Sequence, residues 1–212
     1  MTTEGTADDA AGILLVDDME DNLTALEAVL KPLDQPLVRA RSGEEALAAL
    51  ARRRFAVVLL DVHMPGMDGF ETAAGIKRLE GAKDVPVVFL TAAEDDPGFT
   101  FRGYATGAAD YLRKPFDPWV LRAKVSVFLD LHRKNRQLER TLTQEQAHCA
   151  AVAARLAAVD ALLAADPPDV PEAHRQVREL HRLVDSIRRE RGHWGLSGGS
   201  GRRAATAPHQ RR

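Results

Sequence analysis

Three apolar stretches in the first 115 residues each lead into charged side chains. Asp17 and Asp18 follow the first stretch, Asp61 follows the second, and Lys114 comes soon after the third. Stretches that are apolar throughout are typical of strands covered on both faces, as in a parallel sheet. Because the carboxyl ends of parallel strands lie at one edge of the sheet, these four side chains are expected to meet there. Carboxylates held close together need a cation among them, so the pattern predicts a metal-assisted site that accepts a phosphoryl group.

Length and composition indicate a globular protein, with either one large domain or one ordinary domain and an appendage. The chain has 212 residues, of which 45% are hydrophobic, enough for a sizeable core. No stretch approaches the roughly 18 consecutive apolar residues of a membrane span, and the first residues lack the layout of a secretory signal. We therefore expect a cytoplasmic protein without membrane association. The single cysteine, Cys149, cannot form an intramolecular disulfide.

Charge is unevenly spread along the chain. The last 22 residues contain five arginines and no acidic residue, whereas ten acids match ten bases over 130–190. Since the net charge is −2, residues 1–129 carry the excess of acid, and no direct binding to nucleic acid is expected. The glycine- and serine-rich segment 192–212 is predicted to be a disordered basic tail, and residues 1–11 a disordered N-terminus.

Residues 12–129 alternate short aliphatic stretches with amphipathic segments, which is the pattern of βαβ units. Five such repeats predict an α/β fold with a five-stranded, doubly wound parallel sheet. The expected strands lie near 13–16, 37–40, 57–60, 87–90 and 110–112. The expected helices lie near 21–30, 43–53, 69–79, 98–106 and from 118 onward.

A long helix is predicted after Pro118, because helix-forming residues continue from Trp119 to Ala165 without glycine or proline. A heptad repeat fits this segment from Leu131 to Leu163, and seven of its ten seam positions are aliphatic. The a positions are Asn135, Leu142, Cys149, Leu156 and Leu163, and the d positions are Leu131, Leu138, Glu145, Val152 and Val159. Residues 130–165 are therefore predicted to continue the fifth helix as a coiled coil, with a homodimer as its expected assembly.

A second amphipathic helix is predicted over 172–191, after a proline-rich break at 166–171. It could fold back on the long helix as a hairpin. The sequence leaves two interpretations of this C-terminal region open. It is either a helical appendage without a function of its own, or an element that dimerises or docks a partner.

Four motifs in the first part of the chain resemble the receiver domain of bacterial two-component response regulators. They are Leu14-Leu15-Val16-Asp17-Asp18 with Asn22, Asp61-Val62-His63-Met64-Pro65-Gly66-Met67-Asp68-Gly69, Thr91-Ala92, and Gly107 to Pro115. Their order and spacing match the family over about residues 11–128. The resemblance implies a flavodoxin-like fold with strand order 2-1-3-4-5.

The resemblance also implies a role for each charged residue. Asp61 would be the phosphoacceptor for a sensor histidine kinase. Asp18 would bind Mg²⁺ directly, Asp17 would bind it mainly through water, and Asp61 and the backbone carbonyl of His63 would complete the protein ligands. Lys114 would pair with Asp61 and then with a phosphoryl oxygen, and the bond from Lys114 to Pro115 would be cis.

Two further residues resemble the switch of this family. Thr91 would move to hydrogen-bond the new phosphoryl group, and Tyr111 would turn into the space that Thr91 vacates, although an aromatic core residue is an alternative interpretation of Tyr111. The rearranged surface would include the fifth helix. We therefore expect phosphorylation to change self-association or partner docking through the long C-terminal helix.

Two other functions are weighed against this phosphorelay switch. The first is a transcriptional response regulator with a divergent output region. The second is a phosphohydrolase with an aspartate nucleophile, but such enzymes carry a second acid two residues after the nucleophile, where this chain has His63. We expect a signalling protein rather than an enzyme, with slow self-dephosphorylation at most.

Overall fold

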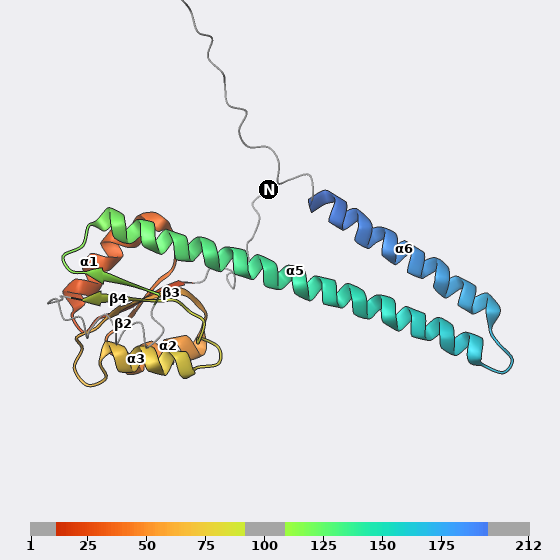
Figure 1. The fold of residues 1–212 in the computed structure, drawn as a ribbon, viewed down its shortest axis with the longest axis horizontal. Coiled ribbons are helices and arrows are strands. Elements are labelled where there is room, and N and C mark those ends of the chain that lie inside the picture. The colour runs from red at the N-terminus through yellow and green to blue at the C-terminus, as the bar shows by residue number, and fades with distance from the viewer. Residues whose placement is uncertain (1–11, 92–108, 195–212) are drawn as a thin grey trace, which may run out of the picture. The chain divides into compact units, whose positions relative to one another are not determined.

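The computed structural model describes residues 12–91 and 109–194 (Figure 1). The chain divides into two compact units, Met1–Arg136 and Gln137–Arg212, which are considered separately below. Three sequence-based expectations fall outside the described residues: the helix near 98–106, the disordered segment 1–11 and nearly all of the basic tail at 192–212.

The first unit contains one sheet of five parallel strands in the order β2-β1-β3-β4-β5, which confirms the predicted fold class. Strands β1, β3 and β4 are each buried along their whole length, as their apolar sequences predict. The strands are β1 Gly12–Val16, β2 Leu37–Ala40, β3 Phe55–Asp61, β4 Val87–Thr91 and β5 Asp110–Arg113.

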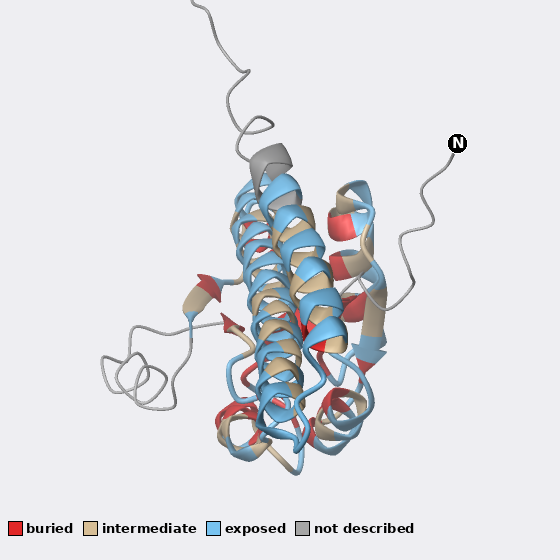
Figure 2. Cartoon of the chain, turned by 90° about the vertical axis from the view of Figure 1, so that its right-hand side faces the viewer, coloured by how far each residue is buried: buried red, intermediate tan, exposed pale blue. Residues whose placement is uncertain are grey.

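Helices cover both faces of this sheet (Figures 1 and 2). One face packs against α1 (Glu20–Leu30), which a short 3₁₀ turn, η1 (Lys31–Leu33), follows, and against the first turns of α5 (Pro118–Ala164). The other face packs against α2 (Gly43–Arg52) and α3 (Gly69–Arg78). This arrangement leaves the carboxyl ends of the strands available for polar side chains.

The turn after β3 is held by its own hydrogen bonds. Asp68 caps α3 by accepting from the backbone N–H of Glu71 at 2.8 Å, and the Glu71 carboxylate accepts from the Asp68 N–H at 3.2 Å. The Gly69 N–H donates to the carbonyl of Val62 at 3.0 Å. The turn therefore closes tightly beside Asp61, the last residue of β3.

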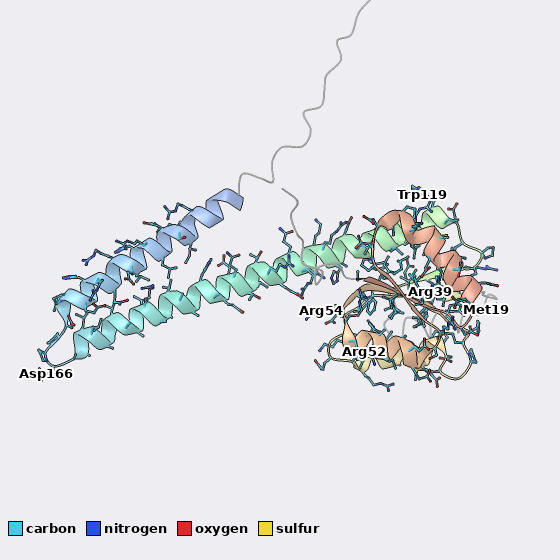
Figure 3. All side chains as sticks on the ribbon, turned by 180° about the vertical axis from the view of Figure 1, so that it is seen from behind. Met19, Arg39, Arg52, Arg54, Trp119 and Asp166 are labelled. Atoms are coloured by element: carbon cyan, nitrogen blue, oxygen red, sulfur yellow. The ribbon has the colours of Figure 1, made fainter. Side chains whose placement is uncertain are left out.

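The second unit contains an antiparallel helical hairpin formed by α5 from Gln137 onward and by α6 (Val170–Trp194), with Asp166 in the connecting turn (Figure 3). Arg155 on α5 donates to Glu179 of α6 at 2.5 Å, and the Asp169 N–H donates to the carbonyl of Leu162 at 3.1 Å. Helix α6 starts two residues earlier than predicted because Asp169 caps it and a proline is tolerated in a first turn.

Helix α5 is continuous over 47 residues, as predicted. By length and composition alone it contains a window apolar enough to cross a membrane, and none of that window is buried. The absence of membrane association stays a prediction.

Gly69 offers a test of the tight turn beside Asp61. A Cβ atom at this position would lie 2.4 Å from the Asp61 carbonyl oxygen and 2.7 Å from the Val62 Cα. Because these are backbone atoms that cannot swing away, Gly69→Ala is expected to lower the free energy of unfolding by about 1–3 kcal/mol. Urea unfolding measures it, with Gly81→Ala as the control, since that Cβ meets no atom within 4 Å. Equal stability of the two variants would contradict the close approach.

Candidate functional site

Three aspartates meet at the carboxyl ends of β1 and β3. Asp17 and Asp18 follow β1, and Asp61 ends β3. One carboxylate oxygen from each residue lies within 4.8 Å of the others. Asp17 and Asp61 are buried, whereas Asp18 is exposed. The structure thus brings together the acidic residues that the sequence predicts at one edge of the sheet.

Lys114 binds both buried carboxylates. Its Nζ donates to Asp17 Oδ2 and to Asp61 Oδ1, at 2.9 Å in each case. The backbone N–H of Lys114 donates to the carbonyl of Thr91 at 2.7 Å, and the bond to Pro115 is cis, as expected. The ammonium therefore comes from β5 to a site built by β1 and β3, where it supplies the counter-charge that buried carboxylates require.

Asn22 holds Asp17, a role that the sequence reasoning did not assign. Its side-chain amide donates to Asp17 Oδ1 at 2.9 Å and to Oδ2 at 3.0 Å, and the Met19 N–H donates to Oδ1 at 3.0 Å. With Lys114, both oxygens of Asp17 accept two hydrogen bonds. The signal in the sequence was the place of Asn22 in the first of the four motifs, which gave the residue no contact of its own.

Burial and charge shift two pKa values in this cluster. Burial raises the pKa of Asp61, and the Asp17 charge adds to this, while the hydrogen bond and charge of Lys114 oppose it without cancelling it. Burial alone would lower the pKa of Lys114, but its bonds to Asp17 and Asp61 outweigh burial and raise it. The lysine therefore stays charged, and ionised Asp61 is held at a cost in free energy.

The donor set fits a small divalent cation. All three side chains offer carboxylate oxygens, and three ionised carboxylates exceed the single positive charge of Lys114. Mg²⁺ prefers oxygen ligands and keeps several waters. Asp18 is exposed, whereas Asp17 already accepts two hydrogen bonds at each oxygen, and the direct contact of Asp18 with an ion stays a prediction. His63 is exposed two residues after Asp61, and its carbonyl as a ligand stays a prediction.

The two predicted switch residues lie on neighbouring strands. Thr91 ends β4 and is buried, and it is in register with Arg113 of β5. Tyr111 is half-buried, with its ring centroid 5.5 Å from that of Phe89, which in turn lies 5.1 Å from that of Phe70. Tyr111 therefore packs against Phe89 of β4, on the face of the sheet that α2 and α3 cover. Ala92 and the residues up to 108 lie outside the described ranges.

Comparison with known proteins agrees with this geometry. The family model "Response regulator receiver domain" matches residues 13–126, which is more than half of the chain. The response regulator PleD of Caulobacter vibrioides is 42% identical over 116 residues, covering 55% of this chain and 25% of that protein. The transcriptional regulatory protein AfsQ1 of Streptomyces coelicolor is 37% identical over 117 residues, covering 55% of this chain and 50% of that protein. The chain thus spans between a quarter and half of these relatives.

A solved structure is similar to the first unit in both fold and sequence. The chemotaxis protein CheY4 of Vibrio cholerae is 33% identical, with a TM-score of 0.53. The match covers 56% of this chain and 98% of that structure.

Asp61→Asn is expected to raise the melting temperature of the metal-free protein at pH 7–8. Since the folded-state pKa of Asp61 is raised, its ionised form costs stability above that pKa, and this cost disappears as the carboxyl is protonated at lower pH. The gain should therefore shrink as the pH falls through the folded-state pKa. A gain of 1 kcal/mol corresponds to about 2–4 °C in a chain of this size.

Differential scanning calorimetry across the pH range measures this gain. Asp84→Asn, in the exposed turn after α3, is the matched control and should leave the melting temperature unchanged. A lower melting temperature for Asp61→Asn at pH 7–8 would show that the bond to Lys114 outweighs the cost of burial.

Proposed function

Because the chain belongs to the response regulator receiver family, we propose that it is a phosphorelay switch in which Asp61 accepts a phosphoryl group from a histidine kinase. One observation carries the proposal: Asp61 is buried, acidic and bound at 2.9 Å by a lysine that also binds Asp17. A buried carboxylate with a matched cation is equipped to act as a nucleophile and then to have its new charge balanced.

The chemical step is a transfer between two phosphoryl carriers. An oxygen of the Asp61 carboxylate attacks the phosphorus of the kinase phosphohistidine, the phosphorus–nitrogen bond breaks, and the imidazole leaves with the electron pair and takes up a proton. Lys114 binds Oδ1, so Oδ2 is the oxygen that we propose as the nucleophile. The product is an acyl phosphate on Asp61.

We propose that Lys114 balances the negative charge of the site both before and after the transfer. Before transfer its ammonium balances Asp17 and Asp61, and afterwards it balances a phosphoryl oxygen as well. Asp17 keeps the ammonium in place throughout, because Asn22 and the Met19 N–H fix that carboxylate. The lysine therefore needs no large movement between the two states.

Asp18, Asp17, Asp61 and the His63 carbonyl are the residues that would hold Mg²⁺. The ion, when bound, supplies positive charge where the phosphoryl oxygens accumulate negative charge. Asp18 contributes an exposed carboxylate that leaves room for water. The Asp17 carboxylate, which its hydrogen bonds hold in place, would add negative charge beside the ion.

The signal is proposed to leave the site through β5 and α5. Thr91 and Tyr111 on β4 and β5 would rearrange toward the phosphoryl group, and Asp110 of β5 accepts from Lys124 of α5 at 2.5 Å. A change in β5 thereby reaches the first turns of α5. We propose that the output is altered self-association or partner docking through α5, in a cytoplasmic protein that is not an enzyme beyond slow self-dephosphorylation.

A transcriptional role is the second candidate, because AfsQ1 is named a transcriptional regulatory protein. That match covers 117 residues, close to the length of the receiver match, and a helical hairpin follows in this chain. Salt-dependent binding of the full chain to DNA would support this role. Sustained turnover of phosphate esters would instead support a phosphohydrolase.

Acetyl phosphate with Mg²⁺ is expected to add one phosphoryl group per chain, and Asp61→Asn is expected to abolish the addition. Asp18→Ala should slow it at least tenfold at limiting Mg²⁺, because that variant lacks the exposed metal ligand. Intact-protein mass spectrometry gives the stoichiometry, and Asp84→Asn serves as the control with full labelling. Labelling that survives in Asp61→Asn would refute the acceptor assignment.

A further inference from the structure

A row of leucines lies exposed along α5 in the second unit. The leucine row consists of Leu138, Leu142, Leu156 and Leu163, whose exposed fractions are 58%, 54%, 49% and 49%. Cys149 is also exposed and continues the row between Leu142 and Leu156. The row extends over 26 residues, or roughly 38 Å of helix at 1.5 Å per residue. A continuous row of this length differs from the scattered single hydrophobic residues that are normal on surfaces.

Helix α6 covers a different face of α5. The partly buried residues of α5 within the hairpin are Glu145, His148, Val152, Arg155, Val159 and Leu162. Arg155 lies in the middle of this face and donates hydrogen bonds to Glu179 and Gln176 of α6. At 100° per residue this face is centred about a quarter of a turn from the leucine row. The d positions Val152 and Val159 therefore belong to the hairpin, and the predicted coiled-coil seam narrows to the a positions and Leu138.

We propose that the leucine row is the contact surface for a second copy of this chain, with the two α5 helices parallel and in register. The two α6 helices would remain on their own α5 and flank this contact, which gives a four-helix bundle. The inference rests on the proposed function in one respect: it names the partner through which the switch would act.

The leucine row itself indicates that the partner is a second copy of the same chain. In a parallel, in-register pair each leucine meets the same leucine of the other copy, so one row is complementary to itself. Asn135, one heptad before Leu142, meets its own counterpart in the same way. A polar residue at a single a position is the feature that fixes register in two-stranded coiled coils.

Charges beside the row favour the parallel direction. The e positions are His132, Glu139, Gln146, Ala153 and Asp160, and the g positions are Lys134, Thr141, His148, Arg155 and Leu162. A parallel pair joins each g position to the e position five residues later in the other copy. Lys134 then meets Glu139, whereas Arg155 stays bound to Glu179 of its own α6.

The antiparallel direction lacks such attraction. It pairs e with e and g with g, so the acidic e positions Glu139 and Asp160 would not meet the basic g position Lys134. The sequence therefore selects one direction for the second copy.

Cys149 provides the test, because it is the single cysteine of the chain and lies in the leucine row. In the proposed dimer its two copies face each other at a distance that a disulfide can span. Mild oxidation of the full chain at micromolar concentration should give a covalent dimer on a non-reducing gel. The matched control is the C149S variant with Ala154→Cys, an exposed position on the far side of α5, which should cross-link at least tenfold more slowly.

Direction is tested by moving the cysteine in the C149S background. With Leu142→Cys alone, a parallel dimer cross-links, whereas an antiparallel dimer centred at position 149 cross-links only when Leu142→Cys and Leu156→Cys chains are mixed. Equal rates for Cys149 and Ala154→Cys, no covalent dimer, or cross-linking only in the mixture would each overturn the proposal. Measuring phosphoryl addition on the same samples distinguishes a failure of the dimer proposal from a failure of the proposed function. Labelling without cross-links refutes the dimer alone. Cross-links without labelling refute the switch alone.

Discussion

The site depends on one ammonium group placed between two buried carboxylates. Lys114 Nζ lies 2.9 Å from both Asp17 Oδ2 and Asp61 Oδ1, and these three residues come from after β5, after β1 and the end of β3. Without the lysine, two buried negative charges would stand side by side at a large desolvation cost. The same contact therefore stabilises the two buried carboxylates and, in the proposed function, prepares Asp61 to accept a phosphoryl group. The remaining positive charge that the cluster needs is what a divalent cation would supply.

The path from this site to an output is short in sequence. Lys114 lies four residues before Pro118, the first residue of α5, and Asp110 of β5 binds Lys124 of α5. Helix α5 then contributes residues to both compact units, since Leu121 and Val125 are buried against the sheet and Arg155 binds α6. Because α5 packs on the sheet and also forms part of the hairpin, it is the element that would couple phosphorylation to association in the proposed function.

Much of the fold was predictable because its signals are local. The apolar stretches of β1, β3 and β4 predicted a covered parallel sheet, and the charged residues at the ends of β1, β3 and β5 located the site. The sequence could not resolve which of several equally suitable residues makes a given contact. The heptad pattern of α5 does not say which of its residues face α6 and which stay exposed, because Val152 and Leu156 are equally apolar. Asn22 was likewise ambiguous, since its role as the anchor of Asp17 depends on a contact between a loop and the following helix.

The central claim is that the state of Asp61 controls association through α5. Light scattering of the full chain with Mg²⁺, with and without beryllofluoride as a phosphoryl mimic, tests site and output together. Beryllofluoride is expected to change the dimer dissociation constant by about 5–150-fold, the usual range of coupling between sites. The dissociation constant of Asp61→Asn is expected to stay the same. An unchanged dissociation constant in the wild-type chain, or the same change in Asp61→Asn, would contradict this claim.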